Sequence, residues 1–281
     1  MKTIHAPIQL QALLSEKRST NQTIGFVPTM GALHQGHLSL VKQSLSNCDI
    51  TVVSIFVNPT QFAPNEDFDA YPRPQKEDSE NLSKLGVDIL FMPSSKEIYP
   101  TPLDRTTQVI VPILSHLYCA ESRPTIFTGA STVLCRLLTI VQATQAFFGE
   151  KDFQQYRIIK QMTKDLFIPT QIMSCQIVRE ENGLAMSSRN RYFSDLEKSQ
   201  ASIIYESLNL AVNSFKDGEH TASTLETLIR DKVKEIDAIK VAYIAFVNPV
   251  TFEKVETVCP KDRILFAGDF NTVRLIDNME F

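Results

Sequence analysis

Short apolar runs separated by amphipathic stretches dominate the chain up to about residue 170. Almost continuous apolar runs are typical of strands that a parallel sheet buries on both faces. They occur at residues 23–30, 50–57, 87–92 and 146–148, and residues 107–111 are expected to add an edge strand. Between them, apolar positions recur at helical spacing, which predicts helices at residues 36–47, 74–85, 131–141 and 153–166. Residues 58–73 are polar, and their length suggests a functional loop.

The pattern changes after about residue 187. Two polar-faced helical stretches, near 195–215 and 221–236, precede three short strands at 241–247, 264–267 and 273–276. Repeated strand–helix units favour a doubly wound, Rossmann-like parallel sheet for the first part. We therefore predict an α/β chain with a Rossmann-like domain at residues 1–180 and a smaller α+β domain at residues 181–281.

Composition narrows the class of partner. The 281 residues are 43% hydrophobic and carry a net charge of −4, which gives no global electrostatic reason to bind nucleic acid or an anionic membrane. A small-molecule partner is favoured. The five cysteines are scattered without paired spacing, which predicts reduced thiols, and neither a signal peptide nor an apolar run of about 18 residues is visible. We expect a cytoplasmic protein.

The segment PTMGALHQGH, residues 28–37, places two of the five histidines on one turn after an apolar run. If Gly31 permits a tight turn and a helix begins near Gly36, the backbone N–H groups at that helix start would attract phosphate. His34 and His37 would then face the same group and donate hydrogen bonds to its oxygens. The alternative is a surface or metal-binding histidine pair, and the position after the first strand of a βαβ unit argues against it.

Two further clusters carry charge at predicted helix starts or loops. In FFGEKDFQQ, residues 147–155, Lys151 is a candidate cation for a phosphoryl group and Asp152 a candidate acceptor for ribose hydroxyls. In MSSRNR, residues 186–191, two hydroxyls and Arg189 could clamp the outer phosphates of a nucleotide. Taken alone, the first cluster reads as a solvated helix start and the second as a polar interdomain loop.

Together these segments resemble the pantothenate synthetase family. The resemblance runs in order over essentially the whole chain, through PTMGALHQGH, SIFVNPTQF, YPRPQKEDSENL, FFGEKDFQQ, GLAMSSRNRYFS and RLIDN. The first segment also resembles the signature of the wider nucleotidyltransferase superfamily, which includes class I aminoacyl-tRNA synthetases. The resemblance implies an ATP-dependent ligase that joins (R)-pantoate to β-alanine, giving pantothenate, AMP and pyrophosphate through a pantoyl-adenylate. It also implies a homodimer whose C-terminal domain acts as a lid.

The resemblance also implies roles for single residues. The residues expected to act on the α-phosphate are His34, His37 and Lys151. The ATP-binding residues would be Met30, His37, Gly149, Lys151, Asp152, Val178, Met186, Ser187, Ser188 and Arg189. The pantoate-binding residues would be Pro28, Met30, Asn58, Gln61 and Gln155. Magnesium is the implied cofactor, with Asp78 as its ligand and Glu77 assisting, although both could simply be acids on a helix surface.

One position departs from the family. In RPTIFTG, residues 123–129, Ile126 stands where the family usually has histidine, and isoleucine can neither donate a hydrogen bond nor carry charge. The departure bears on substrate affinity more than on adenylation, and the partner of the β-alanine carboxylate is not assigned. Two other functions stay open: a nucleotidyltransferase that stops after phosphoryl transfer, and a non-catalytic nucleotide- or metal-binding module. A tRNA synthetase fragment is disfavoured because no basic tract is visible.

Overall fold

The structure, a computed structural model, describes residues 1–62 and 68–281. The chain divides into two compact units, Met1–Gln176 and Ile177–Phe281, called unit 1 and unit 2 below. The division falls slightly before the boundary predicted after residue 180. Among the described residues, no helix has both the length and the apolar character needed to cross a membrane.

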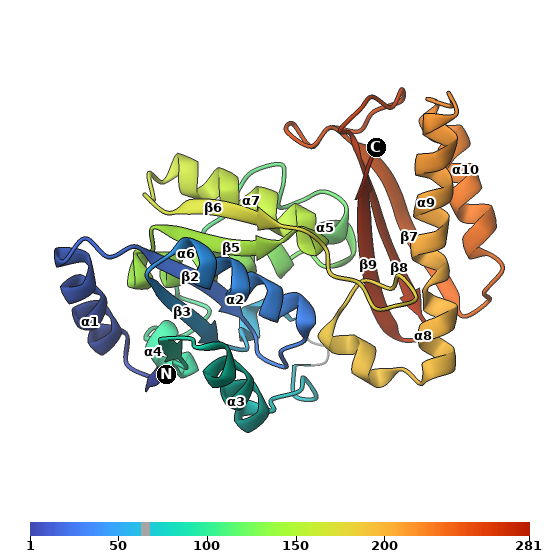
Figure 1. The fold of residues 1–281 in the computed structure, drawn as a ribbon. Coiled ribbons are helices and arrows are strands. Elements are labelled where there is room, and N and C mark those ends of the chain that lie inside the picture. Colours follow the sequence, from blue (N-terminus) through green and yellow to red (C-terminus); the bar gives the residue numbers. More distant parts are fainter. Residues whose placement is uncertain (63–67) are drawn as a thin grey trace. The chain divides into compact units, whose positions relative to one another are not determined.

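Unit 1 is built on a sheet of six parallel strands in the order β1-β4-β3-β2-β5-β6 (Figure 1). The strands are β1 (Lys2–Ile4), β2 (Ile24–Thr29), β3 (Ile50–Ile55), β4 (Ile89–Phe91), β5 (Gln145–Gly149) and β6 (Gln171–Cys175). The predicted Rossmann-like parallel sheet is therefore confirmed. Its central strands β2 and β3 are almost wholly buried, which explains why their sequences are nearly continuous in apolar residues.

Helices cover both faces of this sheet. The helices of unit 1 are α1 (Pro7–Ser19), α2 (Gln35–Asn47), α3 (Gln75–Leu85), α4 (Ser95–Ile98), α5 (Cys119–Ser122), α6 (Ile126–Val141) and α7 (Phe153–Asp165), with the 3-10 turns η1 (Pro59–Gln61) and η2 (Glu150–Asp152). On one face, Val41 of α2 and Leu82 of α3 pack in the same cluster as Val27 of β2. Side chains alternate along a strand, so the fully buried Phe26 points to the opposite face. The helices α1, α6 and α7 pack on one another in turn.

The strand order places a topological switch next to β2. The chain moves from β2 through β3 to β4 on one side of β2, whereas β5 and β6 lie on its other side. In open α/β sheets, ligands bind outside the carboxyl ends of the strands at such a switch point. The segments after β2 and β5, which carry His34 and Lys151, therefore leave neighbouring strands at the same edge of the sheet.

Some sequence predictions for unit 1 are wrong or incomplete. Residues 107–111 form no strand, because Val109 N–H donates to Thr132 Oγ1 and Val109 O accepts from Ser131 Oγ, both on α6. The sheet edges are instead the short strands β1 and β6, which the apolar pattern did not reveal. Helix α1 was also missed, and α6 begins at Ile126, before the predicted start at residue 131.

The loop predicted at residues 58–73 is described on both sides of residues 63–67, which lie outside the described part of the chain. Phe62 packs edge-on against Phe68 and Tyr71, with ring centroids 5.3 and 5.7 Å apart. Arg73 stacks over the Phe68 ring at 5.2 Å.

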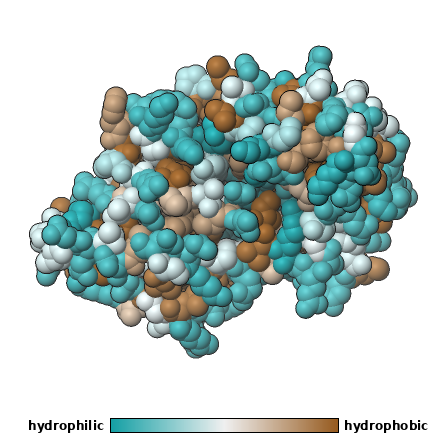
Figure 2. All heavy atoms as spheres, turned by 45° about the horizontal axis from the view of Figure 1, so that its top comes forward, coloured by the Kyte–Doolittle hydropathy of each residue, from teal (hydrophilic) through white to brown (hydrophobic). Residues whose placement is uncertain are grey.

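Figure 2 shows hydrophilic residues over most of the face it presents, with hydrophobic residues in small groups between them.

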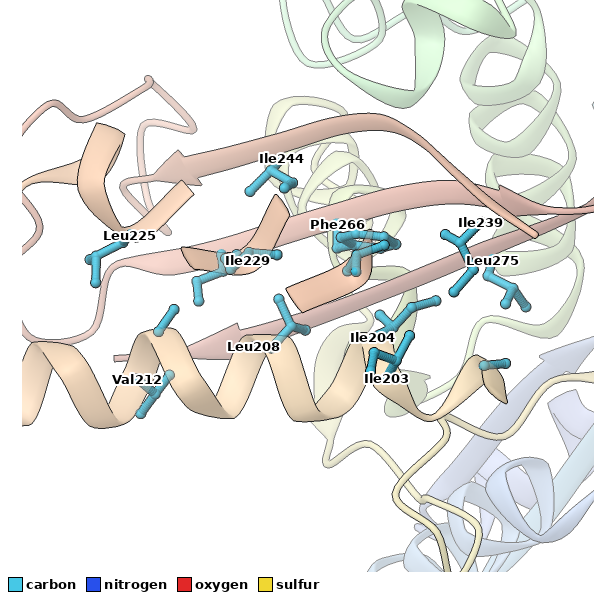
Figure 3. Close-up of a cluster of buried hydrophobic side chains, with 14 of the residues drawn as sticks. Ile203, Ile204, Leu208, Val212, Leu225, Ile229, Ile239, Ile244, Phe266 and Leu275 are labelled. Carbon is cyan, nitrogen blue, oxygen red and sulfur yellow. The ribbon is translucent and has the colours of Figure 1, made fainter. Parts of the chain in front are cut away.

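Unit 2 is an antiparallel sheet in the order β7-β8-β9 with helices packed on it. Its elements are η3 (Ser188–Tyr192), α8 (Asp195–Ala201), α9 (Ile203–Lys216), α10 (Ala222–Val233), β7 (Ile239–Val247), β8 (Arg263–Phe270) and β9 (Val273–Glu280). Figure 3 shows Leu208 of α9 and Ile229 of α10 beside Phe266 of β8, within one apolar cluster. Burial of each such side chain stabilises the unit by about 1.5–3 kcal/mol. The predicted small α+β C-terminal part is confirmed.

Candidate active site

In the turn that follows β2, three successive backbone amides donate hydrogen bonds to side chains. Gly31 N–H donates to Thr29 Oγ1 at 3.1 Å. The next two N–H groups, of Ala32 and Leu33, donate to Asp78 Oδ2 and Oδ1, each at 2.8 Å. Gly31 and Ala32 have φ values of 81° and 51°, in the left-handed region. Glycine adopts that region readily, but alanine does so at a cost of about 1 kcal/mol, so the hydrogen bonds stabilise an otherwise unfavourable path.

The two histidine rings are oriented by the same backbone. Helix α2 begins at Gln35, and Gly36 N–H donates to His34 Nδ1 at 3.1 Å, while His34 N–H donates to His37 Nδ1 at 3.5 Å. The ring centroids lie 4.0 Å apart. Because each Nδ1 accepts a hydrogen bond, each ring carries a proton on Nε2. The sequence led us to expect backbone amides that are available for phosphate. Two of these amides, of His34 and Gly36, instead donate to the histidine rings. The donors that the turn offers are therefore imidazole N–H groups.

His37 is held in its neutral form. Withdrawal of the ring from water, together with the positive charge of Lys151, lowers the pKa of His37 from its ordinary value of 6.5 to about 4. The effect of Lys151 also indicates that these two groups lie near each other in unit 1. At neutral pH the site thus combines an uncharged N–H donor with a lysine cation.

The second part of the site follows β5. Gly149 ends this strand, and η2 then carries Lys151 and Asp152, whose charged groups lie 3.9 Å apart. Lys151 is mostly buried, with its side chain 20% exposed, whereas Asp152 is half-exposed. A Cβ built on Gly149 meets no atom within 4 Å, so open space lies beside this backbone. The arrangement leaves room for a ligand group to approach the Gly149 backbone closely.

Two of the predicted pantoate residues, Asn58 and Gln61, are joined by a hydrogen bond. Asn58 is buried, and its amide donates to Gln61 Oε1 at 3.0 Å and to Gly129 O at 3.1 Å, while its carbonyl accepts from Tyr99 Oη at 2.7 Å. Asn58 therefore fixes the orientation of Gln61. Gly129 is required here, because a Cβ at this position would lie 2.2 Å from Thr60 O.

The other predicted pantoate residues lie near the carboxyl edge of the sheet. Pro28 is within β2, Met30 follows it, and Gln155 is half-buried in the first turn of α7. Met30 lines a pocket of about 210 Å³ together with Gly31 and Asp78. Near Gln61, Arg123 donates to Gln61 O at 3.4 Å, and Ile126, the departure from the family pattern, opens α6 and is half-buried.

The remaining predicted residues belong to unit 2 and are described within it. Met186 N–H donates to Val178 O at 3.0 Å, which joins the two ends of the loop between them. Ser187 caps η3 by accepting a hydrogen bond from Arg189 N–H, and Ser188 is buried. These positions form one compact loop at the start of the unit.

An ion pair between a buried aspartate and a partly buried arginine supports this loop. Arg179 Nη1 and Nη2 donate to the two carboxylate oxygens of Asp277 on β9, at 2.6 and 2.9 Å. Arg179 also donates to Gly183 O at 3.0 Å and stacks on the Tyr205 ring at 4.3 Å. Sequence reasoning did not assign a role to either member of the pair, although the RLIDN segment that contains Asp277 was part of the resemblance.

The residues present do not fit a protein-held metal site at Asp78. Its side chain is 1% exposed, and both oxygens already accept backbone hydrogen bonds. Within residues 1–62 and 68–281, no group of three or more His, Cys, Asp or Glu side chains could hold a metal ion on protein ligands alone. The magnesium role implied for Asp78 is therefore not supported by the geometry around this carboxylate.

A doubly wound sheet whose switch point carries paired imidazoles and a lysine defines a nucleotide-binding α/β protein equipped to act on a phosphoryl group. Residues 2–280 match the profile of a protein family described as pantoate–β-alanine ligase, and the chain belongs to this family.

Pantothenate synthetases from other organisms are similar to this chain over nearly its whole length. A pantothenate synthetase from Caldicellulosiruptor saccharolyticus is 47% identical over 271 residues, covering 96% of each chain, and one from Thermotoga petrophila is 43% identical over 99% of each. The crystal structure of the pantothenate synthetase from Thermus thermophilus matches with a TM-score of 0.93 and 37% identity, covering 100% of this chain and 99% of that one. A Francisella tularensis pantoate–β-alanine ligase, complexed with beta-gamma ATP and β-alanine, matches with a TM-score of 0.79 and 35% identity, over 100% and 97%.

Proposed function

We propose that this enzyme, a pantoate–β-alanine ligase that condenses pantoate with β-alanine using ATP, works through a pantoyl-adenylate formed at the His34 turn. The observation that carries the proposal is the pairing of a neutral His37 with Lys151 at the carboxyl edge of neighbouring strands. A carboxylate is a poor electrophile toward an amine, so it must first be activated. ATP supplies the activation by turning one carboxylate oxygen into part of a good leaving group.

In the first step, a pantoate carboxylate oxygen attacks the α-phosphorus of ATP. A new P–O bond forms, the bond from the α-phosphorus to the bridging oxygen breaks, and pyrophosphate leaves with that electron pair. Negative charge on the equatorial oxygens is met by Nε2–H of His34 and His37 and by the Lys151 ammonium. Donors that are already in place need no reorganisation as this charge develops, and removal of one such donor typically costs about 10²–10³ in rate.

Pantoate binding is assigned to Gln61 and Gln155, whose amides would bond its hydroxyl and carboxylate groups. Pro28 and Met30 would line the apolar side of its pocket. Asn58 would act on Gln61, because its own donors are engaged within the protein. The enzyme thereby holds the attacking oxygen in line with the phosphorus, and such positioning can supply a large part of the rate acceleration.

Candidate ATP-binding residues are assigned in each unit separately. Gly149 and Asp152 of unit 1 would contact the ribose, where the open space beside Gly149 suits a close approach. In unit 2, Ser187, Ser188 and Arg189 would hold the β- and γ-phosphates, with Val178 and Met186 beside the nucleotide. The Arg189 guanidinium is suited to paired hydrogen bonds with phosphate oxygens. Magnesium enters as MgATP, that is, with the substrate.

In the second step, the β-alanine amine attacks the acyl carbon of the adenylate. The C–N bond forms, the amine loses a proton, and AMP departs with the acyl–phosphate oxygen. Ile126 leaves this part of the site without the imidazole that the family usually has, so Arg123 beside Gln61 is the candidate partner for a substrate carboxylate. We also propose a cytoplasmic homodimer, and sedimentation of the purified protein tests the assembly.

The decisive experiment uses pantoate labelled with ¹⁸O in both carboxylate oxygens. With MgATP and β-alanine, the proposal predicts one ¹⁸O in the AMP and one in the pantothenate, measured by mass spectrometry. Unlabelled AMP would rule out the pantoyl-adenylate. Labelled adenylate that β-alanine fails to discharge would support a nucleotidyltransferase that stops after phosphoryl transfer, and nucleotide binding without turnover would indicate a binding module.

A further inference from the structure

We propose that Asp78 is a positioning residue for adenylation: its carboxylate fixes the turn that aims His34 and His37, and it is not a magnesium ligand. The proposal rests on the proposed function of the two histidines. It concerns a contact between residues that are far apart in the sequence, since Asp78 lies on α3 and its partners precede α2.

The carboxylate is placed to bind two consecutive amides at once. Its Oδ2 accepts from Ala32 N–H and its Oδ1 from Leu33 N–H, both at 2.8 Å, in a site that is almost sealed from water. Hydrogen bonds to an ionised acceptor are about twice as strong as those between neutral groups. The pair thus fixes both the position and the direction of this short piece of backbone.

The turn needs such a clamp because its backbone is unfavourable. Ala32 has a φ of 51°, which a side-chain-bearing residue rarely adopts. The preceding Gly31 passes so close to the carboxylate that a Cβ there would lie 3.1 Å from Asp78 Oδ2 and 3.0 Å from Ile55 Cγ2. The path of the chain and the position of the acid are therefore matched to each other.

The helix that carries Asp78 is itself firmly placed. Asp78 N–H donates to Pro74 O at 2.9 Å, in the first turn of α3. Leu82, one turn further along, is fully buried in the cluster that also contains Leu33. The carboxylate therefore fixes the position of the turn relative to the core of unit 1.

The influence of Asp78 reaches the reacting centre through three contacts. It holds Leu33 N–H, Leu33 is bonded covalently to His34, and His34 N–H donates to His37 Nδ1. A shift of the Leu33 amide would therefore move both rings. A misplacement of about 1 Å in such a site can lower the rate about 10²-fold.

The test replaces the carboxylate by its neutral isostere, Asp78→Asn, with Glu80→Gln on the exposed side of the same helix as the matched control. The asparagine NH₂ faces one of the two amides instead of accepting from it. We expect kcat of pantoate-dependent ATP–pyrophosphate exchange to fall about 100-fold, while KM for ATP and the magnesium concentration giving half-maximal activity stay unchanged. The control should leave all three unchanged. Unaltered kcat, or a raised magnesium requirement, would overturn the proposal.

A second readout does not depend on activity or on the variant folding. In the wild-type protein, the amide proton resonances of Ala32 and Leu33 should lie downfield, as expected for hydrogen bonds to a carboxylate, and should stay there when Mg²⁺ is added alone. An upfield movement of both on adding Mg²⁺ would show that the metal takes the carboxylate oxygens, and would refute the positioning role. If the wild-type protein lacks pantoate-dependent exchange, the proposed function fails, whereas this resonance test of Asp78 still stands.

Discussion

Two loops of the molecule are each held by one buried aspartate, but in different ways. In unit 1, Asp78 accepts hydrogen bonds from two consecutive backbone amides, those of Ala32 and Leu33. In unit 2, Asp277 accepts two hydrogen bonds from the charged side chain of Arg179, besides one from the backbone N–H of Asn278. The first aspartate fixes a path of the backbone, whereas the second neutralises a cation that itself holds a loop.

The difference predicts which property each aspartate controls. Loss of the Asp78 carboxylate leaves a short turn without its anchor, so its main effect should fall on the alignment of His34 and His37. Loss of the Asp277 carboxylate leaves the Arg179 charge without its buried partner, and an uncompensated buried charge is strongly destabilising. Substitution of Asp78 should therefore act mainly on the geometry of the candidate site in unit 1, and substitution of Asp277 mainly on the stability of unit 2.

The largest expected effect is on stability. Asp277→Ala should lower the free energy of unfolding by about 3–5 kcal/mol, measured by urea denaturation of the full chain. Asp231→Ala is the control, because this residue pairs with Lys234 on the surface of α10 and should change stability by less than about 1 kcal/mol. Equal effects of the two variants would show that the Arg179 pair contributes no more than a surface pair.

Next comes the charge at the end of β5. Lys151→Met should lower kcat of pantoate-dependent ATP–pyrophosphate exchange by about 10²–10³-fold, because the methionine keeps the bulk of the side chain but not its charge. Lys164→Met, on the exposed end of the neighbouring helix α7, should be without effect. A loss of less than tenfold in the Lys151 variant would remove this cation from the chemistry.

The third prediction concerns pH. The folded-state pKa of His37 is about 4, below its ordinary value of 6.5, so between these values the unfolded chain binds more protons at this position. Stability should therefore fall as the pH is lowered through this window, by about 2 kcal/mol between pH 7.5 and pH 5 from this residue. Urea denaturation of the wild type and of His37→Gln at both pH values isolates the contribution. An identical pH dependence in both proteins would contradict a neutral, desolvated His37.

The smallest effect is expected at Gly149. Gly149→Ala should leave the free energy of unfolding within about 0.5 kcal/mol of the wild type, since the added Cβ enters open space and the backbone is extended. KM for ATP should nevertheless rise about tenfold, because the methyl group occupies space that the proposal gives to the ribose, at about 1.4 kcal/mol per tenfold. Gly25→Ala is the contrasting variant: its Cβ would lie 2.2 Å from Ser44 Oγ, so stability should fall. An unchanged KM at Gly149 would place the ribose elsewhere.

The sequence predicted the parts of the fold whose patterns are local. Strands β2 and β3 were visible because both of their faces are buried. Strands β1 and β6 were not predicted, since one has three residues and the other exposes polar side chains along its length. Residues 107–111 looked like a strand because three of them, Val109, Ile110 and Val111, are apolar and β-branched, whereas the Val109 backbone bonds to side chains of α6.

The candidate site was predictable to a similar extent. The histidine turn and the lysine cluster follow predicted strands, so their chemistry could be inferred from position. The role of Asp78 could not, because the acid contacts amides that precede it by about 45 residues, and only the folded chain brings them together. Arg179 and Asp277, nearly 100 residues apart, were missed for the same reason.

Comparison of Asp78→Asn with Asp277→Asn in one assay tests whether Asp78 acts on the alignment of His34 and His37 and Asp277 on stability. Both variants are measured for pantoate-dependent ATP–pyrophosphate exchange at saturating substrates, and each rate is divided by the folded fraction from urea denaturation. We expect Asp78→Asn to lose about 100-fold in rate per folded molecule, whereas Asp277→Asn should lose stability and keep its rate per folded molecule. A full rate per folded molecule in Asp78→Asn would show that this aspartate does not aim His34 and His37 for the reaction.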